Sequence, residues 1–128
     1  MTWRVQIKSP GGHKQWTFPV VKCMESFIEE AAEHISDSDF VFSTTGKNQL
    51  SDTAMSKFVK ENSDGNWTAH GIRACFRTWA GKEKIDRIVS ELCLSHEVRS
   101  KVERSYDRDD RLEERRLVME AWSKVIDL

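Results

Sequence analysis

The first twenty residues alternate between hydrophobic and polar positions. Every second residue is apolar over residues 3–7 and again over residues 16–20, and residues 9–12 read Ser-Pro-Gly-Gly. A period of two is typical of strands with one buried face, and the proline and glycines favour a turn between them. We therefore predict an N-terminal β-hairpin, with Lys8 on its polar face at the edge of the turn.

The remaining apolar positions recur at helical spacing, three and four residues apart. This pattern predicts helices over about residues 21–35, 51–62, 70–82, 85–94, 98–106 and 110–126, with a short extended piece at 40–42. The predicted N-terminal caps are Ser51 or Asp52, Thr68 and Asp110. The expected fold class is thus mainly α with a small N-terminal β-hairpin (α+β), formed as a single domain over residues 1–128.

Several side chains are expected to be buried in these helices. In the helix over 51–62, Met55, Phe58 and Val59 share the apolar face. The last helix carries Trp122 among its apolar residues, and this helix can pack on its own domain or dock on a neighbouring subunit.

Composition narrows the class of protein. Apolar residues make up 38% and charged residues 32% of the 128, which allows a core and argues against disorder. No apolar run approaches the roughly 20 residues that span a bilayer, and the first residues contain no signal-peptide core. Three widely spaced cysteines without a CxxC pair indicate reduced thiols and neither a disulfide framework nor a zinc site. We expect a cytoplasmic protein.

The net charge of −1 hides an uneven distribution. Residues 1–22 carry four basic side chains and no acidic one, residues 23–66 carry three basic against nine acidic, and residues 67–128 carry thirteen against twelve. The basic N-terminal segment could meet phosphates even though the total charge is close to zero.

Candidate chemistry rests on five side chains: Lys8, His70, Arg73, His96 and Tyr106. On a helix, His70 and Arg73 project side by side, so a guanidinium that binds two phosphate oxygens lies next to an imidazole that can move a proton. Tyr106 is the only tyrosine, and a phenol with a pKa of about 10 needs a base or a cationic pocket to act as a nucleophile.

Each of these residues also has an ordinary structural interpretation. Lys8 beside a turn can be a solvated surface lysine, and His70 with Arg73 can form a polar helix face with salt bridges. His96 can cap the C-terminus of the preceding helix. Tyr106 can be a core aromatic that continues the apolar face of residues 98–102.

The order and the flanks of these residues resemble a known family. Residues 70–80 (HGIRACFRTWA) resemble the His-Gly-Phe-Arg box of phage and prophage integrases, which are tyrosine recombinases that cut and rejoin DNA. Residues 91–96 (ELCLSH) resemble their Leu-x-His segment, and residues 101–106 (KVERSY) are similar to the segment with their nucleophile. Residues 112–116 (LEERR) and 119–122 (MEAW) resemble their closing helix. Before residue 67 the resemblance rests on the Lys8 hairpin followed by two helices.

The resemblance implies a fold of the tyrosine-recombinase catalytic-domain type and a role for each residue. Tyr106 would attack a DNA phosphodiester and form a 3′-phosphotyrosyl link, and Arg73 would hold the non-bridging oxygens. His70 would accept the tyrosine proton, His96 would hydrogen-bond the phosphate, and Lys8 would protonate the leaving 5′-oxygen. No metal or nucleotide cofactor is implied. The implied partners are double-stranded DNA at attachment sites and other recombinase subunits in a tetrameric synapse.

The sequence departs from the family pattern in one respect. The family uses a first arginine well upstream of the hairpin lysine, and here Lys8 is almost at the first residue, with only Arg4 before it on the same strand. We therefore expect the C-terminal part of a catalytic domain, without the first-arginine segment and the core-binding domain, and with little or no activity alone. The competing hypotheses are a catalytically dead DNA-binding or interaction domain of the same fold, relaxation by a type IB topoisomerase, and an unrelated helical domain.

Overall fold

The structure, a computed structural model, describes residues 1–9, 12–33, 43, 47, 48, 50, 51, 53–96 and 110–126, and for residues 6–9 and 13 the backbone alone. The described chain is mainly helical with a two-stranded N-terminal sheet, which confirms the α+β class. Its internal contacts group into two compact units, Met1–Cys23 with Arg77–Leu128, and Met24–Phe76. The predicted extended piece at 40–42 and the helix at 98–106 lie outside the described residues.

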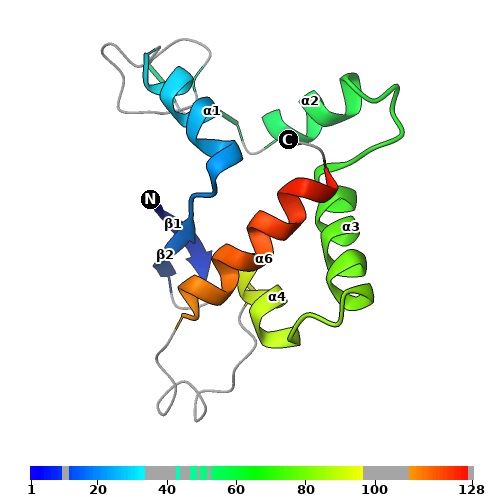
Figure 1. Cartoon of the computed structure of the whole chain (residues 1–128). Helices are drawn as coiled ribbons and strands as arrows, with labels where there is room; N and C mark the ends of the chain where they lie inside the picture. Colours follow the sequence, from blue (N-terminus) through cyan, green and yellow to red (C-terminus); the bar gives the residue numbers. More distant parts are fainter. Residues whose placement is uncertain are drawn as a thin grey trace. The chain divides into compact units, whose positions relative to one another are not determined.

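The hairpin forms as the alternating pattern predicts. Strand β1 (Thr2–Ser9) pairs antiparallel with β2 (Gly12–Pro19), from Thr2 opposite Pro19 to Ser9 opposite Gly12 (Figure 1). Gly12 has a φ of +115°, a conformation that side-chain-bearing residues rarely adopt, so a glycine is required where the chain enters β2. One side of the hairpin joins the core through Trp16, which is 7% exposed.

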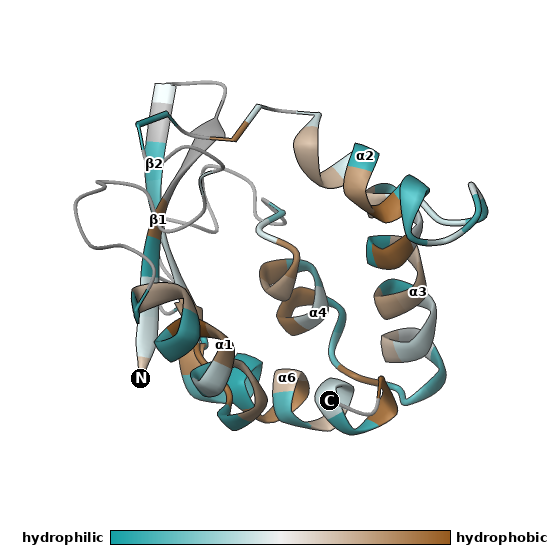
Figure 2. Cartoon of the chain, turned by 90° about the horizontal axis from the view of Figure 1, so that it is seen from above, coloured by the Kyte–Doolittle hydropathy of each residue, from teal (hydrophilic) through white to brown (hydrophobic). Residues whose placement is uncertain are grey.

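The core of the first unit lies between the hairpin and two helices, α4 (Arg87–Cys93) and α6 (Leu112–Val125). Helix α6 packs against both β2 and α4 (Figure 1), and Figure 2 shows the hydrophobic residues of α4. Among the described residues of this unit, the buried apolar side chains are Trp16, Val20, Val21, Ala80, Val89, Leu92 and Leu94. The Trp122 ring of α6 lies 5.0 Å from the Trp79 ring, so this part of the last helix packs on its own chain.

Two neighbouring arginines of α6 bind the hairpin. Arg115 donates to the Thr17 carbonyl oxygen at 2.8 Å, and Arg116 donates to the Val20 carbonyl oxygen at 2.9 Å. The predicted cap of this helix is wrong. Arg111 occupies the N-cap position with a left-handed φ of +48°, and Asp110 instead places a carboxylate oxygen 3.8 Å from Arg115.

The second unit contains most of α1 (Lys22–Glu33), α2 (Ala54–Glu61) and the first half of α3 (Ala69–Lys82). The pattern predicted these helices. Asp64 and Gly65, between α2 and α3, have positive φ angles of 50° and 79°. The predicted Ser51 cap is wrong, because α2 begins after Thr53, which makes no capping bond through its side chain. Asp52 lies outside the described residues.

The expected burial of the α2 apolar face is also wrong. Met55 and Phe58 are 61% and 63% exposed, and Val59 is half-buried. The helical pattern is present, but neither α1 nor the start of α3 packs extensively along α2. An amphipathic pattern predicts which side chains share a face, and burial depends on what covers that face. None of the described helices is long and apolar enough to cross a membrane.

Candidate functional site

The first turn of α3 is fixed by the threonine that precedes it. The Thr68 hydroxyl oxygen accepts a 2.9 Å hydrogen bond from the Gly71 N–H, which confirms Thr68 as the predicted cap. A Cβ at position 71 would lie 3.1 Å from that hydroxyl oxygen, so glycine leaves room for the cap. The cap therefore defines where α3 begins and which side chains its first turns present.

His70 and Arg73 lie on these first turns, three residues apart, and both are exposed. Side chains three residues apart on a helix project to the same side. An imidazole and a planar guanidinium are thus presented together, the first able to exchange a proton and the second able to bind two oxygens of an anion.

Lys8 lies where the sequence places it along the hairpin. It is opposite His13, one pair before the terminal pair of Ser9 and Gly12. This register confirms the position at the edge of the turn. Tyr106, the candidate nucleophile, lies outside the described residues.

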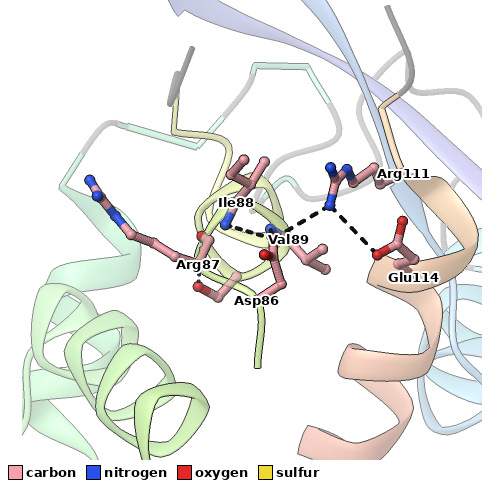
Figure 3. Close-up of polar contacts among 7 residues, drawn as sticks. Asp86, Arg87, Ile88, Val89, Arg111 and Glu114 are labelled. Atoms are coloured by element: carbon pink, nitrogen blue, oxygen red, sulfur yellow. Dashed lines mark hydrogen bonds and ion pairs between the residues drawn. The ribbon is translucent and has the colours of Figure 1, made fainter. Parts of the chain in front are cut away.

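Helix α4, which precedes His96, has a capped start tied to α6. Asp86 accepts hydrogen bonds from the Ile88 and Val89 N–H groups at 3.0 and 3.1 Å. An Arg111 Nη1 lies 3.5 Å from the same carboxylate oxygen and 3.8 Å from Glu114 (Figure 3). The beginnings of α4 and α6 are therefore joined through one exposed carboxylate.

The end of α4 has the hydrogen bonds of a Schellman motif. The Ser95 N–H donates to the Leu92 carbonyl oxygen at 3.1 Å, and the His96 N–H donates to the Glu91 carbonyl oxygen at 3.0 Å. Ser95 takes the left-handed φ of +59° that this motif requires. His96 follows directly, so the motif determines the direction in which its side chain leaves the helix end.

The His96 imidazole belongs to a cluster built around Glu91, which is 4% exposed. His96 Nδ1 lies 2.6 Å from Glu91 Oε2, and Arg77 Nη2 of α3 lies 2.6 Å from Glu91 Oε1. The same arginine and glutamate border an open hollow of about 200 Å³, lined by Arg77, Gly81, Ile85, Arg87, Ser90 and Glu91. The cluster thus holds a buried carboxylate between two groups that can each carry positive charge.

The Cys93 thiol, two residues after Glu91, is a poor nucleophile at neutral pH. Burial raises the pKa of Cys93 to about 11, and the nearby positive charge of Arg115 only partly opposes this effect. The thiolate is the nucleophilic and metal-binding form, so at neutral pH Cys93 is a protonated, half-buried residue. Within the described residues, no three His, Cys, Asp or Glu side chains gather as metal ligands would.

The structure thus brings together two sets of residues. His70 and Arg73 share the start of α3 in one unit, while His96 lies with Glu91 and Arg77 in the other unit, which also contains Lys8. The convergence of Lys8, His70, Arg73, His96 and Tyr106 on one phosphate stays a prediction.

Sequence reasoning assigned no role to Glu91 or Arg77. The only available signal was an acidic residue inside the apolar run of residues 88–94, where a solvated carboxylate would be out of place. Arg77 shares a helical face with His70 and Arg73, which gave no indication that it reaches a carboxylate on another helix.

Comparison with known proteins gives one informative similarity. The chain is 25% identical over 127 residues to the prophage integrase IntA of Escherichia coli strain K12, an alignment that covers 97% of this chain and 31% of that protein. The chain therefore spans about a third of the length of the curated relative it matches. No protein-family model and no solved structure matches the chain. The similarity supports a distant relationship to integrases.

Proposed function

We propose that this chain is the C-terminal part of the catalytic domain of a tyrosine recombinase that integrates and excises DNA at specific sites. The observation that carries the proposal is the similarity to a prophage integrase over nearly the whole chain. The motifs around His70, His96 and Tyr106 lie within that similarity and agree with it, because their order and flanks resemble those of integrases. Its substrate is double-stranded DNA, and its partners are further recombinase subunits in a tetramer.

The proposed chemistry is an in-line displacement at phosphorus. The Tyr106 oxygen forms a bond to the phosphorus as its proton passes to His70, and the bond to the 5′-oxygen breaks as Lys8 supplies a proton. Arg73 and His96 stabilise the negative charge that builds on the non-bridging oxygens. Attack by the 5′-hydroxyl of another strand reverses these steps with exchanged partners, and the phosphotyrosyl link conserves the bond energy.

The described geometry supports two parts of this assignment. His70 and Arg73 are exposed on one side of α3. Arg73 can bind a phosphate oxygen there while the neighbouring His70 accepts the tyrosine proton. His96 stands at a helix end whose backbone and imidazole are both held, which suits a hydrogen-bond donor of defined direction.

The test is trapping of a covalent protein–DNA adduct. A nicked suicide substrate containing the attachment site of the parent element is incubated with this chain and with a version that includes the coding sequence preceding it. Tyr106→Phe and Arg73→Ala are made in both, and denaturing gels report the adduct. We expect an adduct from the extended version, its loss in Tyr106→Phe, and a decrease of roughly 100- to 1,000-fold in its rate of formation in Arg73→Ala.

The outcomes separate the competing functions. An adduct that persists in Tyr106→Phe would overturn the assignment of the nucleophile. Folded extended protein that binds the attachment site without forming an adduct would instead identify a DNA-binding domain without catalysis. Relaxation of supercoiled DNA without strand exchange would favour a topoisomerase.

A further inference from the structure

The Glu91 carboxylate is buried and paired on both of its oxygens, whereas most carboxylates are exposed to solvent. It is 4% exposed, and each of its two oxygens lies 2.6 Å from a nitrogen, Oε1 from Arg77 and Oε2 from His96. Burying a carboxylate is costly unless it is paired and hydrogen-bonded. The two short contacts offset the desolvation of the carboxylate, and they fix the carboxylate, the guanidinium and the imidazole relative to one another.

Glu91 also holds the main chain of His96. The His96 N–H donates to the Glu91 carbonyl oxygen at 3.0 Å, and this bond closes the end of α4. One residue therefore fixes both the backbone from which the imidazole projects and the rotation of the ring itself. A histidine that only capped the helix end would need no second contact through its side chain.

The chemistry of the carboxylate determines the state of the ring. An ionised carboxylate accepts hydrogen bonds and donates none, so the nitrogen that faces it, Nδ1, carries the hydrogen. The proton on Nε2 then decides whether the imidazole donates to a phosphate oxygen or accepts a proton. Arg77 balances the negative charge of Glu91, so the carboxylate does not repel an approaching phosphate.

We propose that Glu91 is a positioning residue for His96, which it keeps in the Nδ1–H form with Nε2 directed to the scissile phosphate, and that Arg77 anchors Glu91 for this purpose. The part about the phosphate rests on the proposed function. The part about the ring and its tautomer does not, because it follows from contacts within this chain.

The test of the tautomer uses this chain alone. Long-range proton–nitrogen correlation spectra of uniformly ¹⁵N-labelled protein distinguish Nδ1–H from Nε2–H in neutral histidines, and His96→Gln assigns the signal. We expect neutral His96 to be the Nδ1–H tautomer, although in water the Nε2–H tautomer predominates. An Nε2–H signal in the unaltered chain would overturn the proposal.

A nearly isosteric substitution sharpens this test. In Glu91→Gln, the side chain has one acceptor oxygen for the two donors, Arg77 and His96. The permanently charged Arg77 is the stronger donor, so it binds that oxygen. The amide NH₂ then faces Nδ1, which must become an acceptor, so we expect His96 to switch to Nε2–H. Ser90→Ala is the matched control on the same helix, because its hydroxyl bonds the Arg87 carbonyl oxygen and contacts neither His96 nitrogen. An unchanged tautomer in Glu91→Gln would contradict the proposal.

A kinetic measurement connects the ring to the reaction. In the extended version, Glu91→Gln should slow adduct formation by roughly 10- to 100-fold, as loss of a residue that orients a functional histidine commonly does. In a His96→Ala background the same change should have no further effect. Additive effects would overturn positioning through His96. An Nδ1–H tautomer in a protein that forms no adduct would leave the ring assignment intact and refute the recombinase proposal alone.

Discussion

The guanidinium carbon of Arg115 lies 5.0 Å from the centre of the Trp16 ring, and Arg115 is fully buried. Its Nη2 also donates a 2.8 Å hydrogen bond to the Thr17 carbonyl oxygen. A buried cation is tolerated where its charge and most of its N–H groups have partners. Here the Trp16 ring, the Thr17 carbonyl oxygen and Asp110 are the partners of the two terminal nitrogens and the charge, and only Nε has no hydrogen-bond partner among the described residues. Arg115 is therefore a structural residue that joins α6 to β2.

Arg115→Ala should destabilise the protein by about 2–4 kcal/mol, because it removes the ring contact and leaves the Thr17 carbonyl oxygen without this donor. Urea unfolding followed by circular dichroism measures the loss. Arg111→Ala is the matched control, since its ion pairs with exposed carboxylates should contribute about 1 kcal/mol or less. Equal losses in the two variants would show that Arg115 is not a core residue.

Alkaline pH should weaken the fold through Cys93. Burial raises the pKa of its thiol from 9.0 to about 11, so the unfolded chain loses this proton at lower pH than the folded chain. The stabilisation is fully present below about pH 9 and is lost as the pH rises towards about 11. The decline of Tm over this range should be steeper in the unaltered protein than in Cys93→Ala. Parallel declines would rule out a contribution from Cys93.

Asp86 allows the cap of α4 to be separated from its ion pair. Asp86→Asn keeps an oxygen for the Ile88 and Val89 N–H groups and loses only the charge that faces Arg111, so unfolding free energy should change by less than about 0.5 kcal/mol. Asp86→Ala loses the cap as well and should cost about 1 kcal/mol. Equal costs, measured by urea unfolding, would mean that the ion pair dominates.

A double-mutant cycle should show that Gly71 is needed to leave room for the Thr68 hydroxyl. Replacing a helical glycine with alanine normally gains about 0.5–1 kcal/mol, but in Gly71→Ala the new methyl crowds the Thr68 hydroxyl. We expect this gain in a Thr68→Ala background and its absence when Thr68 is present. Thermal unfolding of the four proteins measures the difference, and the same gain in both backgrounds would contradict the crowding.

The elements that depend on local pattern were predictable. The hairpin register follows from strict alternation around a glycine turn, and the start of α3 follows from one threonine placed before a helical run. Local signals failed at the start of α6, where Asp110 pairs with the buried Arg115 and Arg111 takes the cap position. At this helix start, the ion pair with Arg115 outweighs the preference of an aspartate for the N-cap position.

The charged residues of the interior were not predictable from one sequence. Glu91 and Arg115 belong to residue types that usually face solvent, and their burial depends on partners contributed by other helices and strands. The sequence singled out His70, Arg73 and His96 as candidates by spacing and flanks, and the structure adds which side chains contact the His96 imidazole. Nothing in the spacing from Glu91 to His96 reveals that a helix end turns the imidazole back onto the carboxylate.

The bonds from α6 to the hairpin also have a consequence for biosynthesis. Arg116 donates to the carbonyl oxygens of Val20 and Met1, which are separated from it by almost the whole length of this chain. A ribosome therefore releases the hairpin long before the helix that completes its packing, and an isolated two-stranded hairpin is marginally stable in water. The contacts between α6 and the hairpin can form only after translation has passed residue 116. Until then the hairpin has no helix α6 to pack against, so it is the segment of this unit that would need protection by a chaperone.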